Sequence, residues 1–96
     1  MNTLELLKER RQQIIEIASK HGAYDIRIFG SVVRDADRPD SDIDILVKRR
    51  EQISKWFPAG LILELENVLK RRIDVVTEKG LNPFIKEHVM KEAVTL

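Results

Sequence analysis

The sequence predicts an α/β domain in which helices pack against a three-stranded sheet. Segments with helical apolar spacing alternate with short segments of period-two spacing, in the order α-β-α-β-α-β-α. Apolar residues make up 43% and charged residues 34% of the chain, a composition typical of a globular protein. The 96 residues show no internal repeat, so we expect one domain spanning residues 1–96.

The first predicted helix begins after Asn2, which can cap it, with Glu5 as its partner in a capping box. Apolar residues recur at helical spacing and would form one buried face: Leu4, Leu7, Ile14, Ile15 and Ala18. Gly22 is a natural stop after the last turn. We therefore expect one helix between Asn2 and Gly22.

A first strand is expected over residues 24–29, where apolar and polar residues alternate. The alternation would place three side chains on one face: Tyr24, Ile26 and Ile28. Gly30 and Ser31 break the pattern. Ser31 is a good helix cap, so a short helix is expected to begin at Val32. Residues 37–41 are typical of a turn because they combine Asp, Pro and Ser.

A second strand is expected over residues 42–47 and a third over residues 73–77. Between them a helix is expected that is marked by Leu61, Leu65, Val68 and Leu69 and ends in residues 70–72. In the second strand, Asp42 and Asp44 would face away from three apolar side chains: Ile43, Ile45 and Val47. The charged segment between this strand and the helix has no clear periodicity.

The final helix is expected to begin with Asn82 as its N-cap and Pro83 at its first position. It would run through Ala93 and bury one face made of three residues: Ile85, Val89 and Ala93. A turn at Lys79 and Gly80 separates this helix from the third strand.

Composition argues against several classes of protein. The chain has 17 Lys and Arg against 16 Asp and Glu, a formal net charge of +1, so bulk charge does not predict DNA binding. There is no cysteine, which excludes a disulfide scaffold and thiolate metal sites. The apolar runs are short and the first residues lack a signal-peptide pattern, so we expect a cytoplasmic protein with no membrane partner.

Three aspartates lie inside predicted strands, where aspartate is disfavoured and costly to bury: Asp42, Asp44 and Asp74. Asp42 and Asp44 leave the same face of their strand about 6.6–6.8 Å apart. Asp74 joins them if the third strand lies beside the second. Carboxylate oxygens suit Mg²⁺ or Mn²⁺, and a pair of such ions about 3.5–4 Å apart serves phosphoryl and nucleotidyl transfer.

Two alternative roles for these aspartates stay open. In one, they lie on an exposed edge and only keep it soluble. In the second, Asp40, Asp42 and Asp44 with Glu51 occupy four ligand positions of an EF-hand calcium loop. The calcium loop is disfavoured because Ile45 stands where that loop needs glycine.

The Gly30-Ser31 pair lies between a strand and a predicted helix start, where free N–H groups bind phosphate. Gly30 would let the backbone approach closely, and the Ser31 hydroxyl adds a donor. Ten residues separate Ser31 from Asp42, enough for a short helix and a turn. The chain would then return beside its own start, so that phosphate donors face the carboxylates.

These residues resemble the polymerase-β-type nucleotidyltransferase superfamily, whose signature is a Gly-Ser pair followed at this distance by Asp-x-Asp. Here the pair is Gly30-Ser31 and the second motif is residues 42–44. The stretch GSVVRDADRPDSDIDILV is most similar to the minimal nucleotidyltransferase (MNT) group, and residues 73–83 are similar to that group's third-carboxylate region. The resemblance runs from Tyr24 to the C-terminus and implies the minimal nucleotidyltransferase fold, an α+β arrangement around a small mixed sheet.

The resemblance implies roles for individual residues. Three would hold two divalent ions, Mg²⁺ or Mn²⁺, and act in catalysis: Asp42, Asp44 and Asp74. Three would bind the triphosphate of the substrate ATP: Gly30, Ser31 and Arg34. For Arg34 the alternative is an ion pair with Asp35 or Asp37. Val33 and Asp35 depart from the small residues common at their positions in the family.

The resemblance also implies a partner. MNT proteins look like antitoxins paired with a HEPN ribonuclease toxin, and the implied reaction moves AMP from ATP onto a tyrosine of that toxin. This would make the chain a protein adenylyltransferase in a hetero-oligomer. Two alternatives stay open: an antitoxin that neutralises its partner by binding alone, and a nucleotidyltransferase for a small molecule or an RNA end.

Overall fold

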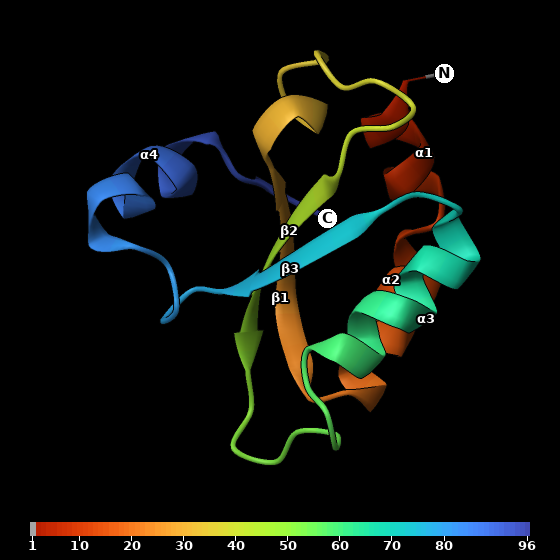
Figure 1. The fold of residues 1–96 in the computed structure, drawn as a ribbon, viewed down its shortest axis with the longest axis vertical. Helices are drawn as coiled ribbons and strands as arrows, with labels where there is room; N and C mark the ends of the chain where they lie inside the picture. The colour runs from red at the N-terminus through yellow and green to blue at the C-terminus, as the bar shows by residue number, and fades with distance from the viewer. Residues whose placement is uncertain (1) are drawn as a thin grey trace.

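The computed structural model describes residues 2–96 and shows helices and strands in alternation (Figure 1). In chain order the elements are α1 (Thr3–Glu9), α2 (Arg11–Lys20), β1 (Ala23–Phe29), the 3₁₀ turn η1 (Gly30–Val32), β2 (Ile43–Arg49), α3 (Ala59–Leu69), β3 (Ile73–Thr77), α4 (Pro83–Glu92) and β4 (Val94–Thr95). Within residues 2–96, no helix is long and apolar enough to span a membrane.

The sheet is mixed, as expected, and its strands lie in the order β3-β2-β1-β4. Strand β1 pairs antiparallel with β2 and with β4, whereas β2 and β3 run parallel. The expectation of three strands was wrong by one. Strand β4 has two residues and is defined by its pairing with β1, so no local period could predict it.

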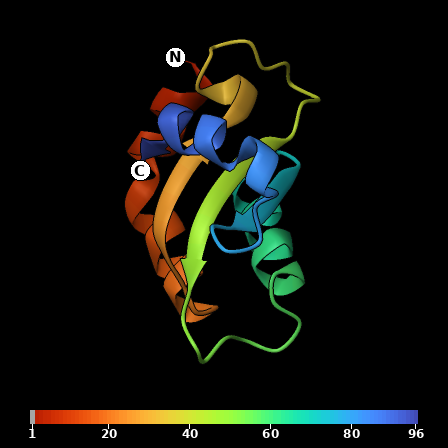
Figure 2. The ribbon, with the colours of Figure 1, turned by 90° about the vertical axis from the view of Figure 1, so that its left-hand side faces the viewer.

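Helices cover both faces of the sheet (Figures 1 and 2). Helices α1, α2 and α3 lie on one face, and their apolar side chains form the main core with alternate strand residues, including Ile43, Ile45 and Val47. Figure 2 shows α4 in front of the opposite face. A smaller cluster lies there, around Leu46 and Val89. The two faces of β2 are therefore buried in different cores.

The expected N-terminal helix is two helices. Asn2 caps α1 as predicted, because its side-chain oxygen accepts a hydrogen bond from the Glu5 N–H at 2.9 Å. The helix breaks at Arg10, which has φ −96° and ψ 13°. Residues 8–13 are all exposed, so no buried side chain holds this stretch to a straight axis.

Strand β1 carries an irregularity that overturns the predicted alternation. Its register with β2 shifts between Tyr24 and Arg27, and Asp25 adopts φ 53°. Tyr24 is therefore exposed, at 42%, instead of facing inward with Ile26. Arg27, in the same strand, is buried, and its Nη2 donates a hydrogen bond to Oε2 of Glu78 at 2.6 Å. A one-residue shift is enough to move side chains to the other face.

Helix α4 begins as predicted, since the Asn82 side chain accepts from the Phe84 N–H and Pro83 follows at the first position. Its expected inner face is only partly correct. Val89 is buried, but Ile85 is 49% exposed because the first half of α4 extends beyond the small cluster.

Candidate active site

The structure brings Asp44, Asp74 and Gly30 together at one end of the sheet. In the register of the strands, Asp44 pairs with Phe29 at the end of β1 and with Asp74 at the start of β3. Paired residues on neighbouring strands, about 4.8 Å apart, point to the same face. Asp44 alternates with Ile43 and Ile45, which belong to the main core, so the two aspartates lie on the α4 face. The expected adjacency of the second and third strands is confirmed.

Gly30 packs directly against Asp44. It follows β1 with φ +80°, and a Cβ at this position would lie 2.3 Å from an Asp44 carboxylate oxygen. Both the backbone conformation and the space therefore require glycine. The chain returns beside its own start, as the spacing of the motif suggested, and Gly30 lies against the carboxylate of Asp44.

Ser31 does not act as the predicted helix cap. It lies inside η1, whose N-cap is Phe29, and the turn has no side-chain cap hydrogen bond. The turn is instead closed by the Val33 N–H donating to the Gly30 carbonyl and the Ala36 N–H donating to the Ser31 carbonyl. Its backbone is thus fixed by main-chain bonds.

Negative charge accumulates around Asp44. Burial raises the pKa of its carboxyl group, and the charges of Asp74 and Asp42 raise it further. Arg34 opposes the shift, while Glu92 adds to it. The carboxylate thus experiences more like charge than compensating charge, an environment that a bound cation would relieve.

Asp42 and Asp74 are more exposed than Asp44. Strand β2 begins at Ile43, one residue later than predicted, so Asp42 lies just outside it. Its carboxylate is 3.3 Å from Nε of Arg72. Among residues 2–96, no three His, Cys, Asp or Glu side chains converge into a complete ligand set. Mg²⁺ is usually held by one or two carboxylates together with substrate phosphates. The aspartates of this site therefore fit Mg²⁺ without a third protein ligand.

Arg34 makes neither of the ion pairs considered from the sequence. Its guanidinium pairs with Glu92 at the end of α4. Glu92 is largely buried, at 12% side-chain exposure, and also lies 3.5 Å from His88. Glu92 could not be predicted from the sequence, because nothing local distinguishes it from any other acidic residue near a helix end. It is the acidic side chain that α4 contributes near Asp44.

Comparison with known proteins places the chain in a family. Residues 10–96 match the family model described as "Nucleotidyltransferase domain". The chain is 40% identical over 88 residues to "Putative protein adenylyltransferase MJ0435" of Methanocaldococcus jannaschii, covering 92% of this chain and 95% of that protein. It is 37% identical over 79 residues to protein adenylyltransferase MntA of Thermococcus cleftensis, covering 82% of this chain and 80% of that protein.

Solved structures agree with this assignment. A structure described as "Structure of putative minimal nucleotidyltransferase" is 43% identical and superposes with a TM-score of 0.84, covering 100% of this chain and 97% of that one. A toxin–antitoxin structure with AMP-PNP has the same fold at 19% identity, with a TM-score of 0.71 over 92% of this chain and 70% of that one. The chain therefore belongs to the nucleotidyltransferase domain family and is a nucleotidyltransferase of the minimal type.

Proposed function

We propose that this nucleotidyltransferase moves AMP from ATP, with Mg²⁺, onto a tyrosine hydroxyl of a partner HEPN ribonuclease toxin and thereby acts as an antitoxin. Relatives named protein adenylyltransferase support a protein acceptor. A neighbour in fold comes from a toxin–antitoxin pair. The observation that carries the chemistry is the pairing of Asp44 with Asp74 directly beside Gly30.

Each residue of the site has a role in this proposal. Asp42 and Asp44 would bind Mg²⁺, or Mn²⁺, and Asp74 would complete the site. Asp74 would also accept the proton of the attacking hydroxyl, as the hydroxyl oxygen bonds to the α-phosphate of ATP and pyrophosphate leaves. Mg²⁺, when bound, supplies charge neutralisation for the phosphates. Gly30 and Ser31 would hold the triphosphate from their turn. Arg34 lies close enough to influence Asp44, and it would exchange Glu92 for a phosphate oxygen.

Modification of the partner would account for an antitoxin effect. Each AMP adds a phosphodiester charge to the tyrosine. At an RNA-cleaving site, that charge and the bulk of the nucleotide would oppose the approach of the RNA backbone.

The test is transfer of label from ATP to the partner. Purified protein is incubated with a HEPN-type partner, Mg²⁺ and ATP labelled in the α-phosphate, and the partner is analysed by mass spectrometry. We expect an AMP-sized increment on a tyrosine, abolished in the D42N/D44N double variant. Asp40→Asn is the matched control, because Asp40 is an exposed aspartate of the same loop and should leave transfer unchanged.

The remaining outcomes identify different functions. If the D42N/D44N protein neutralises the toxin fully without ATP, the antitoxin acts by binding. If label accumulates on RNA or on a small molecule while the partner stays unmodified, the acceptor is of that class. Transfer retained by D42N/D44N would refute the assignment of the aspartates.

A further inference from the structure

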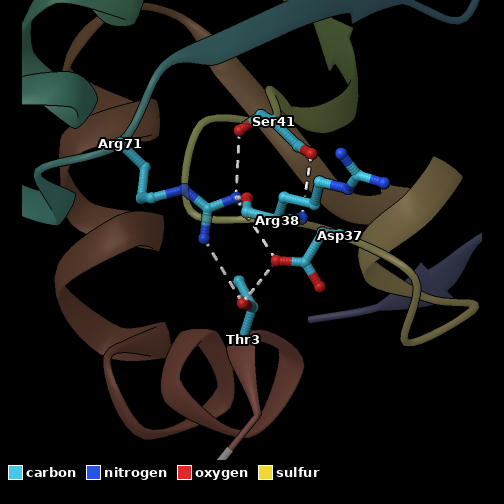
Figure 3. Close-up of polar contacts among 5 residues, drawn as sticks. All are labelled: Thr3, Asp37, Arg38, Ser41 and Arg71. Carbon is cyan, nitrogen blue, oxygen red and sulfur yellow. Dashed lines mark hydrogen bonds and ion pairs between the residues drawn. The ribbon is translucent and has the colours of Figure 1, made fainter.

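The half-buried side chain of Arg71 holds the loop between Gly30-Ser31 and Asp42. Arg71, which precedes β3, donates from Nη2 to the carbonyl of Arg38 at 2.9 Å and to the carbonyl of Ser41 at 2.9 Å (Figure 3). The same nitrogen is 3.3 Å from Oδ2 of Asp37. One guanidinium therefore contacts both ends of the turn at residues 38–41.

The loop is also joined to the N-terminal helix. The Thr3 hydroxyl donates to Oδ2 of Asp37 at 2.7 Å, and Nη1 of Arg71 lies 3.4 Å from that hydroxyl. The Arg71 and Asp37 side chains are only 16% and 8% exposed. Figure 3 shows the three side chains converging from the start of α1, the loop and the segment before β3. We call Thr3, Asp37 and Arg71 the loop clamp.

The segment that carries Arg71 of the loop clamp also contacts Asp42 and its neighbour. The last pair that joins β1 to β2 is Phe29 with Asp44, so Asp42 lies beyond that ladder. It is positioned instead from the other side, by the residue after Arg71. The carbonyl of Arg72 accepts from the Ile43 N–H at 2.8 Å, and Nε of Arg72 is 3.3 Å from the Asp42 carboxylate.

We propose that Arg71 is a positioning residue for this site, fixing the loop so that Asp42 stands beside Asp44 in the geometry that Mg²⁺ requires. The inference rests on the proposed metal-dependent AMP transfer. It identifies a residue outside the signature motif, brought to the site by the fold. The planar guanidinium reaches its partners from two nitrogens, Nη2 for the two carbonyls and Asp37 and Nη1 for the Thr3 hydroxyl, an arrangement that the single ammonium nitrogen of lysine does not reproduce.

Loss of the loop clamp should weaken the affinity for Mg²⁺ more than the affinity for ATP. Residues that orient metal ligands typically change metal affinity or activity by about 10–100-fold when altered. We expect Arg71→Gln to raise the Mg²⁺ concentration for half-maximal transfer by at least about tenfold. The apparent KM for ATP at saturating Mg²⁺ should change much less, and Arg71→Lys should restore only a small part of the loss.

The experiment compares Arg71→Gln with Arg38→Gln. Arg38 has an exposed side chain in the same loop, so its substitution removes an equal charge outside the clamp. Two readouts do not depend on transfer: binding of Mn²⁺ measured by electron paramagnetic resonance, and hydrogen exchange of the amides of residues 36–43 measured by mass spectrometry. Arg71→Gln should weaken Mn²⁺ binding and accelerate exchange in this segment about tenfold, and Arg38→Gln should do neither.

Thr3→Val provides a milder test if Arg71→Gln fails to fold. It removes the hydroxyl that joins Asp37 to α1 while keeping a similar volume, and it should shift both readouts in the same direction. Unchanged Mn²⁺ binding and exchange in a folded Arg71→Gln or Thr3→Val protein would overturn the proposal. If the wild type transfers no AMP but both readouts respond, AMP transfer fails and the positioning of Asp42 stands.

Discussion

At the residue scale, the site depends on how closely the backbone approaches a carboxylate. Gly30 has φ +80°, and its missing Cβ leaves the space that an oxygen of Asp44 occupies. We predict that Gly30→Ala destabilises the fold by about 1–3 kcal/mol, because the left-handed backbone is strained and the carboxylate must move. Urea unfolding measures this change, and nucleotide transfer should be lost as well.

Gly80→Ala is the control for that substitution. A Cβ there would meet the Thr77 hydroxyl at 2.8 Å, and Gly80 is not among the residues with positive φ. A side-chain hydroxyl can rotate, so the cost should be smaller than at Gly30. Equal destabilisation by the two alanines would contradict the close approach of Gly30 to Asp44.

Asp37 provides a prediction of pH dependence. The Thr3 hydroxyl is the largest cause holding the pKa of Asp37 below its ordinary value of 3.8, with Arg71 acting in the same direction and burial opposing both. A lowered folded-state pKa means that the carboxylate stabilises the fold above pH 3.8 and that this contribution disappears as the pH falls through the folded-state value.

The difference in unfolding free energy between the wild type and Asp37→Asn should therefore be constant from pH 5 to pH 7 and shrink below about pH 4. The constant difference in unfolding free energy between pH 5 and pH 7 should be about 1.5–3 kcal/mol, the usual contribution of a hydrogen bond to a charged group. Denaturant unfolding across this pH range measures the difference. A difference that grows as the pH falls would show that Asp37 is not held as a carboxylate.

At the element scale, the strands β2 and β3 were predictable from sequence, and their contacts show why. Each is a short apolar run with an aspartate at its second position, and the register pairs Asp44 with Asp74. The alternation of apolar and polar residues along the sequence was therefore enough to predict which carboxylates lie on the same face of the sheet. It also failed locally, since β1 changes register near Asp25 and Tyr24 turns outward.

The contacts that sequence could not predict join elements far apart in the chain. Glu92 at the end of α4 pairs with Arg34, and within the loop clamp Arg71 pairs with Asp37. A charged residue carries no local mark of the partner it will meet after folding. Strand β4 was missed for the same reason, because its two residues gain their conformation only by pairing with β1.

Helix α4 should open locally more readily than α2 and α3, which bury three residues each. Val89 is its buried residue and packs in the small cluster with Leu46 and Leu81. We predict that Val89→Ala costs about 1–2 kcal/mol and accelerates hydrogen exchange in α4 more than in β2. Val75→Ala makes the same chemical change in the main core and should instead accelerate exchange across β2 and β3. Identical exchange profiles for the two variants would refute the separation of the two clusters.

At the scale of the whole molecule, the mixed sheet gathers the chemistry at one end. The end of β1 and the starts of β2 and β3 meet there, with α4 alongside (Figures 1 and 2). A hollow of about 600 Å³ lies at the opposite end, lined by residues that include Tyr24, Lys48 and Thr77. The hollow is thus separate from the carboxylates, of which Asp42 and Asp74 are exposed and Asp44 is half-buried.

The most direct test of this arrangement is the binding of a non-hydrolysable ATP analogue, measured by calorimetry with and without Mg²⁺. We predict binding to the wild type and to Asp40→Asn that requires Mg²⁺, and none to the D42N/D44N protein under the same conditions. Equal binding without Mg²⁺, or binding retained when both aspartates are replaced, would contradict a metal-dependent nucleotide site at the start of β2.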